Sequence, residues 1–262
     1  MNCLFCKEPS TNTIGVEHII PQSLGNIDIT LPKGFVCDKC NQYFSTKVEK
    51  PLLESEFFLH SRFRNQVPSK KGRIPSISAV MMPNQIELDY FIDKNGKKSI
   101  AVKKEKDEKQ YIDYIQSNNS GHMYINTVPD IPDLSDKIIS RFLSKIAVEA
   151  LAHRLKDKEG ALQYLVDDSQ LDPIRKYARY AEGVSFWPFN ARRIYSEDKC
   201  FSDERGTDFE VLHEFDLLYT EEKELYLVCA IFGVEYVINY ASTELYGYHQ
   251  WLKSNNNRSP LY

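Results

Sequence analysis

Apolar residues recur with the period of an α-helix in the middle of the chain. Between Ser135 and Lys156 they are Ile138, Ile139, Phe142, Leu143, Ile146, Ala147, Ala150, Leu151 and Leu155. Such a stripe buries one face of a helix, so we expect a core helix here. A second helix is expected to start at Asp172-Pro173, a capping residue followed by a proline at the first helical position, and to end at Gly183.

Runs rich in β-forming residues flank this helix on both sides. Before it they are Ile74 to Val80, Ile86 to Ile92 and Ser99 to Val102, and after it they are Phe209 to Tyr219, Glu224 to Phe232 and Glu235 to Tyr240, followed by a short helix from Thr243 to Lys253. The Asn95-Gly96 step is a hairpin signal because both residues tolerate positive φ. We therefore expect residues 69–262 to form a larger α+β domain with a mostly antiparallel sheet.

The first fifty residues have the pattern of short, turn-rich elements. Two short strands are predicted by the apolar run from Val16 to Ile20 and by Phe35-Val36, and a helix is expected from about Lys39. Pro51 suits the first turn of a further helix, where its missing N–H would be unpaired anyway. The stretch from Pro68 to Gly72 has the composition of a linker, so residues 1–68 are expected to form a first domain.

The composition is that of an ordinary soluble protein. Of the 262 residues, 42% are hydrophobic and 27% are charged. No apolar run approaches the ~18 residues of a membrane span, and the N-terminus lacks the basic-then-apolar pattern of a secretory signal. We expect a cytoplasmic protein with no membrane partner. In that reducing compartment, cysteines favour metal ligation over disulfides.

Four of the six cysteines form two Cys-x-x-Cys pairs: Cys3 with Cys6, and Cys37 with Cys40. Zinc takes four ligands in a tetrahedron, and two such pairs supply four thiolates, so we expect a structural Zn²⁺. A redox-active pair is the alternative, but it does not explain two pairs and lacks the usual strand–helix setting. Cys200 and Cys229 have no His or Cys neighbour at ligand spacing, and we expect buried free thiols.

The thirty residues between the two cysteine pairs carry a second motif. It is Glu17-His18-Ile19-Ile20-Pro21-Gln22-Ser23-Leu24-Gly25, and Asn41 directly follows the second pair. Together with the cysteines, this combination resembles the zinc-containing branch of the HNH endonuclease family over residues 3 to 50. The resemblance implies a ββα-metal fold, in which a strand carrying the acid and the histidine packs beside a helix that brings the third residue to them.

The resemblance also implies a role for each residue of the motif. Glu17 and Asn41 would hold one catalytic cation, and oxygen donors of this kind suit Mg²⁺ or Mn²⁺. His18 would deprotonate the attacking water, since an imidazole titrates near neutrality. The alternatives are that His18 merely packs or ligates zinc, and that Asn41 caps a helix.

One part of the family pattern is missing. HNH segments usually carry a central Asn shortly before the second cysteine pair, which steadies the catalytic loop. Here that position falls at Pro32-Lys33-Gly34, where proline and glycine offer no side-chain amide. Asn26, or a backbone carbonyl beside His18, is expected to take over this role.

The formal net charge of −4 is unevenly distributed along the chain. The stretch from Arg62 to Arg73 contains five basic residues and no acidic one. Lysines and arginines hold nucleic-acid backbones without regard to sequence. The candidate contacts are Lys47, Arg62, Arg64, Lys70, Lys71 and Arg73. The alternative is a solvated face, which is the interpretation we favour for the lysine pairs at 97–98 and 103–104.

Two functional hypotheses follow. The first is a metal-dependent DNA endonuclease that hydrolyses phosphodiester bonds, with RNA as a further candidate substrate and a C-terminal domain for targeting, dimerisation or regulation. Relatives of such architecture often belong to bacterial restriction, mobile-element or anti-phage systems, so a defence setting with a partner protein is expected. A symmetric homodimer would be one way to make double-strand breaks with one site per chain. The rival is a non-catalytic zinc-knuckle module that binds nucleic acid or protein. Only the enzyme needs Glu17 and His18, whereas both need the cysteines.

Overall fold

The computed structural model describes residues 1–118, 121–196, 199–202, 204–209 and 212–261. These residues form two compact units, the first made of Met1–Leu53 with Asp130–Tyr262 and the second of Glu54–Pro129. This division differs from the predicted boundary after residue 68. The reason is that helices from the C-terminal part pack directly against the N-terminal segment, so the two are one unit.

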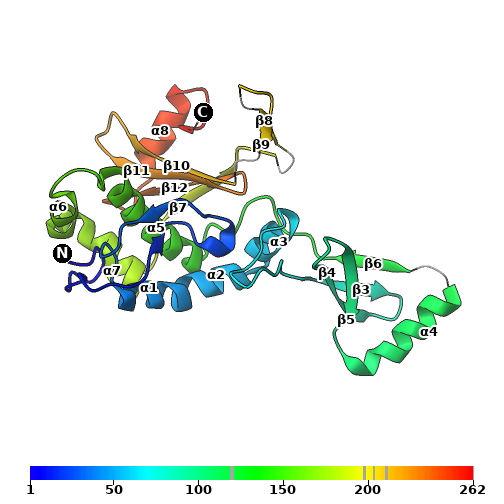
Figure 1. Cartoon of the computed structure of the whole chain (residues 1–262). Coiled ribbons are helices and arrows are strands. Elements are labelled where there is room, and N and C mark those ends of the chain that lie inside the picture. The colour runs from blue at the N-terminus through cyan, green and yellow to red at the C-terminus, as the bar shows by residue number, and fades with distance from the viewer. Residues whose placement is uncertain (119–120, 197–198, 203, 210–211, 262) are drawn as a thin grey trace. The chain divides into compact units, whose positions relative to one another are not determined.

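The first unit is built around a four-stranded antiparallel sheet with the order β10-β11-β12-β7. The strands are β7 (Phe189–Arg193), β10 (His213–Tyr219), β11 (Leu225–Ile231) and β12 (Val234–Asn239). Helix α5 (Lys137–Leu155) packs on one face and α8 (Tyr246–Ser254) on the other (Figure 1). A separate two-stranded sheet joins β8 (Phe201–Ser202) to β9 (Asp208–Phe209). The strands predicted at Glu224 to Phe232 and Glu235 to Tyr240 are confirmed with small shifts at their ends. The strand predicted from Phe209 to Tyr219 is confirmed from His213 onward, whereas Phe209 belongs to β9 and residues 210–211 lie outside the described part of the chain.

Helix α5 is the core helix that the apolar stripe predicts. Asp136 caps it, because its carboxylate accepts hydrogen bonds from the N–H groups of Ile138 at 2.7 Å and Ile139 at 3.2 Å. It is followed by α6 (Ala161–Asp167), a 3-10 turn η4 (Ser169–Leu171) and α7 (Asp172–Tyr180). Helix α7 ends before the predicted Gly183, because Ala181 already adopts a left-handed conformation with φ of 58°.

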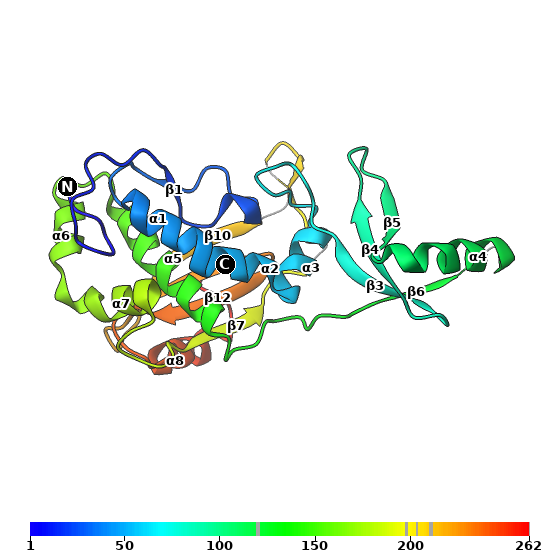
Figure 2. The same cartoon turned by 90° about the horizontal axis from the view of Figure 1, so that it is seen from below.

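The N-terminal segment adds two short strands and a long helical stretch to the first unit. The elements are β1 (Glu17–His18), a 3-10 turn η1 (Gln22–Leu24), β2 (Thr30–Leu31), α1 (Asp38–Phe44), a π-helical turn η2 (Ser45–Glu49) and α2 (Lys50–Glu54). Strands β1 and β2 pair antiparallel, and α1, α5 and α7 lie side by side (Figure 2). The predicted strand at Phe35-Val36 is wrong. These residues lie in a bend after Gly34, whose φ is +92°, and the carbonyl of Phe35 accepts from the N–H of Leu4 instead.

The second unit is a four-stranded antiparallel sheet with the order β5-β4-β3-β6. Its elements are α3 (Glu56–Arg64), β3 (Ile77–Met82), β4 (Ile86–Ile92), β5 (Lys98–Val102), a 3-10 turn η3 (Glu105–Asp107), α4 (Glu108–Asn118) and β6 (His122–Ile125). Helix α4 covers one face of the sheet with Tyr111, Tyr114 and Ile115. The predicted hairpin at Asp93 to Gly96 is confirmed.

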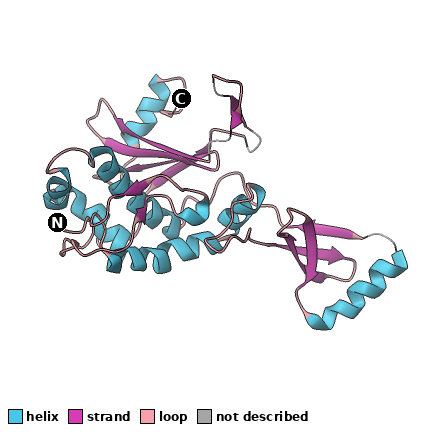
Figure 3. Cartoon of the chain, viewed as in Figure 1, coloured by secondary structure: helices cyan, strands magenta, loops and turns pink. Residues whose placement is uncertain are grey.

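Both units mix helices with antiparallel strands, so the α+β fold class is confirmed (Figure 3). Across the described part of the chain, every helix is too short or too polar to cross a membrane.

His213 connects the C-terminal sheet to the loop that follows β1. Its Nε2 donates to the carbonyl oxygen of Leu24 at 2.5 Å. Burial lowers the pKa of His213 to about 4, although this hydrogen bond acts in the opposite direction. The ring is therefore neutral at physiological pH and holds the loop as a neutral donor.

A neutral, half-buried His213 makes the first unit sensitive to acid. Unfolded histidine titrates near 6.5 and folded His213 at about 4, so the unfolded chain binds more protons between these values. The free energy of unfolding should therefore fall as the pH drops through this window, by up to about 3 kcal/mol from this group. Glutamine can donate the same hydrogen bond but does not titrate. Between pH 7 and pH 4.5, the free energy of unfolding of His213→Gln, measured with urea, should therefore fall by roughly 2 kcal/mol less than that of the wild type. Equal losses in both proteins would contradict this.

Candidate active site

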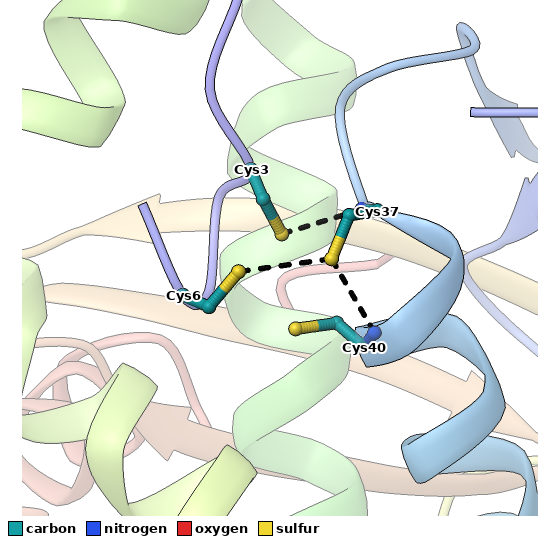
Figure 4. A group of neighbouring side chains, drawn as sticks. All are labelled: Cys3, Cys6, Cys37 and Cys40. Atoms are coloured by element: carbon teal, nitrogen blue, oxygen red, sulfur yellow. Dashed lines mark hydrogen bonds between the residues drawn. The ribbon is translucent and has the colours of Figure 1, made fainter. Parts of the chain in front are cut away.

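The four cysteines of the two Cys-x-x-Cys pairs come together at the start of α1 (Figure 4). Their sulfur atoms all lie within 4.8 Å of one another, and none is in a disulfide. Among the described residues, this is the one group of three or more His, Cys, Asp or Glu side chains placed to hold a metal ion. Four thiolates at this spacing suit a tetrahedral zinc ion, so the predicted grouping of Cys3, Cys6, Cys37 and Cys40 is confirmed.

Hydrogen bonds to sulfur prepare the cluster for a cation. Cys37 caps α1, with its Sγ accepting from the N–H of Cys40 at 3.4 Å, and the N–H of Cys37 donates to Cys3 Sγ at 3.3 Å. A hydrogen bond from Cys40 lowers the pKa of Cys3 to about 5, and the same bond raises the pKa of Cys40, while burial raises that of Cys6 to about 11. The backbone N–H donors favour the thiolate, which is the form that binds zinc.

A buried guanidinium group lies against the cysteine cluster. Arg179 of α7 donates from Nε to Cys40 Sγ at 3.4 Å, and its guanidinium carbon lies 3.6 Å from the ring centroid of Tyr43. Arg141 of α5 donates to the hydroxyl of Tyr43 at 3.1 Å. Four thiolates around Zn²⁺ leave excess negative charge, so a neighbouring cation lowers the cost of burying the site.

Asn26 holds the loop between β1 and β2. Its Nδ2 donates to the carbonyl oxygens of Ile20 at 2.6 Å and Ile29 at 2.9 Å, and its Oδ1 accepts from the N–H of Ile29 at 2.9 Å. Asn26 is buried, so water does not compete for these bonds. Asn26 therefore closes the loop directly after β1. This is the role that we expected Asn26, or a backbone carbonyl beside His18, to take over from the missing central Asn.

Asn41 lies one turn into α1, close to the chain that leads into β1. The helix-cap alternative is wrong, because Cys37 is the cap and the N–H of Asn41 donates to the carbonyl of Cys37 at 3.0 Å. A Cβ atom placed on Gly15 would lie 3.4 Å from Nδ2 of Asn41. The amide of Asn41 therefore reaches the backbone two residues before Glu17.

Asp38 ties the same two segments together. Its carboxylate accepts hydrogen bonds from the N–H of Ile14 at 3.1 Å and of Gly15 at 3.0 Å. These two bonds, that of Gly15 first, lower the pKa of Asp38. The entry into β1 is thus attached to the first turn of the helix that carries Asn41.

Glu17 and His18 differ in their surroundings. Glu17 is 6% exposed, whereas His18 is half-buried, as expected when neighbouring side chains of a strand point to opposite faces. Oε1 of Glu17 lies 2.7 Å from Nζ of Lys145, a fully buried residue of α5. The predicted acid therefore faces an ammonium group that the motif did not indicate.

Lys145 faces two further carboxyl groups. Oε1 of Glu49 in η2 lies 3.2 Å from its Nζ, and Oε2 of Glu149 lies 2.8 Å from it. Burial alone would lower the pKa of Lys145, but the three carboxylates raise it well above its usual value, so the ammonium stays charged. For Glu149, burial is the largest effect and raises its pKa well above the ordinary carboxyl value.

The predicted nucleic-acid contacts lie in different environments. Lys47 is exposed on η2, and the exposed candidates in the second unit are Arg64, Lys70, Lys71 and Arg73. Arg62 is only 7% exposed, and burial lowers the pKa of its guanidinium. It follows the buried Phe58 by one helical turn on the inner side of α3, so it lies too deep to contact a phosphate.

The sequence motifs do not indicate Lys145, Glu149 or Arg179. Lys145 and Glu149 stand four residues apart within the buried part of the predicted core helix, and a charged pair there was the available signal. Arg179 carries no comparable signal. Cys229 is buried as predicted, but Cys200 is exposed, because it precedes the small two-stranded sheet rather than the core.

Comparison with known proteins agrees with this geometry over the N-terminal segment. Residues 3–57 match the family model described as HNH endonuclease. No curated protein and no solved structure matches the chain. The matched segment contains the four cysteines, β1, β2 and α1, whereas Lys145 and Arg179 lie outside it.

Replacing Cys37 by Ser should remove the zinc ion and weaken the whole first unit. A structural zinc contributes on the order of 10 kcal/mol of binding free energy to folding, and α7 contacts the cluster through Arg179. We expect one zinc per chain in the wild type, none in Cys37→Ser, and a lost or much lower melting transition. Metal analysis and calorimetry measure both. Cys200→Ser, an exposed cysteine outside the cluster, is the control; full zinc content in Cys37→Ser would refute the site.

Proposed function

We propose that this chain, whose residues 3–57 are an HNH endonuclease segment, is a metal-dependent nuclease that hydrolyses phosphodiester bonds in DNA. The observation that carries the proposal is the place of His18. It lies on β1, which Asp38 ties to the first turn of α1, within the matched segment. The cysteine cluster at the start of the same helix supports this assignment.

In this proposal His18 is the general base. Its backbone is held by pairing with Thr30 and by the ammonium of Lys145, whose Nζ lies 3.3 Å from the His18 carbonyl oxygen. Its half-buried side chain retains contact with solvent. A nitrogen of a neutral imidazole accepts a proton, so His18 can take one from a water molecule aligned with the scissile phosphate.

Glu17 and Asn41 would hold the catalytic divalent cation. A carboxylate and an amide oxygen are donors that Mg²⁺ and Mn²⁺ accept, and the carboxylates of Glu17 and Glu49 against one ammonium leave negative charge beside β1. A carboxylate has several lone-pair positions, so Glu17 can contact Lys145 and a cation together. When bound, the ion compensates the charge that develops on the phosphate and the leaving oxygen.

The second unit carries the positive charge that DNA requires. Residues 54–129 contain 12 lysines and arginines and 9 aspartates and glutamates, a formal charge of +3, whereas the remaining residues contain 21 and 28, a charge of −7. Backbone phosphates are bound through such local charge rather than through the net charge of a chain. We therefore assign the main DNA contact to the second unit.

A cleft in the second unit is the proposed contact site. Its volume is about 830 Å³, and Arg73, Lys94 and Phe91 line it. Two acidic residues at the cleft are already engaged: Asp93 accepts from two backbone N–H groups of the hairpin turn, and Asp89 pairs with a lysine at 3.5 Å. Arg73 and Lys94 can then bind phosphates while Phe91 stacks on a base.

A non-catalytic zinc-knuckle module is the second candidate. The ion pair between Glu17 and Lys145 favours it, because a neutralised carboxylate attracts a metal ion less strongly. Such a module would bind nucleic acid or a protein through the same zinc-stapled fold. It would need the cysteines but not the imidazole of His18.

His18→Ala separates the two candidates. Loss of a general base lowers the rate about 10²–10⁴-fold, so plasmid cleavage with Mg²⁺ or Mn²⁺ should fall by this factor while zinc content and melting temperature stay unchanged. His249→Ala, which removes an exposed histidine on α8, is the control. Equal activity of the wild type and His18→Ala on DNA and RNA across these metals would exclude catalysis by this site.

Arg73→Ala/Lys94→Ala tests the cleft. Removing two phosphate contacts should weaken DNA binding and reduce the slope of log K against log salt by roughly 2, measured by fluorescence anisotropy. Lys106→Ala/Lys109→Ala removes the same charge near α4 and should have the smaller effect. If both double variants lose affinity equally, the cleft is not the contact site.

A further inference from the structure

The strand that carries Glu17 and His18 is held by a residue from the C-terminal part of the chain. Lys145 of α5 is fully buried, and its Nζ lies 3.3 Å from the carbonyl oxygen of His18 and 3.5 Å from that of Ile19. The same Nζ lies 2.7 Å from Oε1 of Glu17. One ammonium group therefore contacts three successive residues at β1 and its exit.

Strand β1 depends on contacts of this kind. It is two residues long and pairs with β2 at two positions, which is too short a ladder to define an orientation by itself. Asp38 holds the chain before β1, and Asn26 holds the loop after it. Lys145 contacts the stretch between these two anchors.

The other partners of Lys145 fix the ammonium against the helices. Glu49 follows α1 in the same continuous helical stretch, and its Oε1 lies 3.2 Å from Nζ. Glu149 lies one turn along α5, with Oε2 at 2.8 Å. The Nζ atom of Lys145 thus links β1 to the helical stretch that follows Asn41, in addition to the link that Asp38 makes before β1.

Stability alone does not account for a charge at this place. Burying an ammonium group costs several kcal/mol, and replacing a buried ion pair by apolar side chains is often neutral or stabilising. Phe142 and Ile146 beside it on α5 are apolar and fully buried, so an apolar residue would suit the core. An apolar residue would not bind the carbonyl groups of β1 or the carboxylate of Glu17.

We propose that Lys145 is a positioning residue of the nuclease site, whose ammonium group orients β1 and thereby places His18 and Glu17 relative to α1. The inference rests on the proposed function. It makes α5, which lies outside residues 3–57, part of the catalytic centre.

The test is Lys145→Met/Glu149→Met in the full-length, zinc-loaded protein. Lys145→Met alone would leave three carboxyl groups without a counter-ion and is prone to unfold, so the double variant replaces the ion pair along α5 by two apolar side chains. Arg154→Met is the matched control, since it breaks the exposed ion pair of Arg154 with Asp216 near the end of the same helix. All assays are carried out below the lowest melting temperature among the wild type, the double variant and Arg154→Met.

We expect kcat of the double variant to fall about 10²-fold, as for a small misplacement of a catalytic group, with KM for DNA and zinc content near the wild-type values. Amide hydrogen exchange should rise in residues 14–24 but not in residues 37–44, and Arg154→Met should change neither. A folded double variant with wild-type kcat, or with unchanged exchange in residues 14–24, overturns the proposal. If the wild type itself cuts no nucleic acid, the proposed function fails, and the exchange measurement alone decides whether Lys145 orders β1.

Discussion

The ammonium group of Lys145 lies 127 residues along the chain from His18, yet the two are joined by a hydrogen bond in the interior. A charge in a medium of low dielectric must keep its partners, because water is not there to replace them. The five oxygen atoms around it come from β1, its exit, η2 and α5. Moving one of these elements alone would separate Lys145 from part of its partners, so this cluster reinforces the packing that makes residues 1–53 and 130–262 one unit.

The long helical stretch that begins at α1 is held at two places by charge. At its start, the cysteine cluster takes up negative charge when it binds zinc, and Arg179 of α7 lies against Cys40. Further along, at the last residue of η2, Glu49 faces Lys145 of α5. Both cations come from the C-terminal part of the chain, so the zinc-stapled segment depends on that part for its electrostatic balance as well as for its packing.

Charge is divided between the two units in a way that fits their proposed tasks. The unit that contains β1 and the cysteines is acidic, whereas residues 54–129 are basic. An acidic unit attracts a divalent cation but repels a phosphate backbone, and a basic unit does the opposite. In the proposed function, the basic residues 54–129 supply the attraction to nucleic acid, and the acidic unit supplies the attraction to a divalent cation.

The sequence by itself determined the features that depend on spacing along the chain. The two cysteine pairs meet, the apolar stripe forms α5, the Asn95-Gly96 step turns a hairpin, and the motif around Glu17 and His18 matches the HNH family, because each rests on neighbours only a few residues apart or on a recurring combination. Tertiary structure alone decided that Glu17 meets Lys145, that Cys40 meets Arg179 and that Arg62 is buried. These contacts depend on which faces of distant elements pack together. The sequence indicates which face of an element is apolar, but it does not indicate which other element packs against that face.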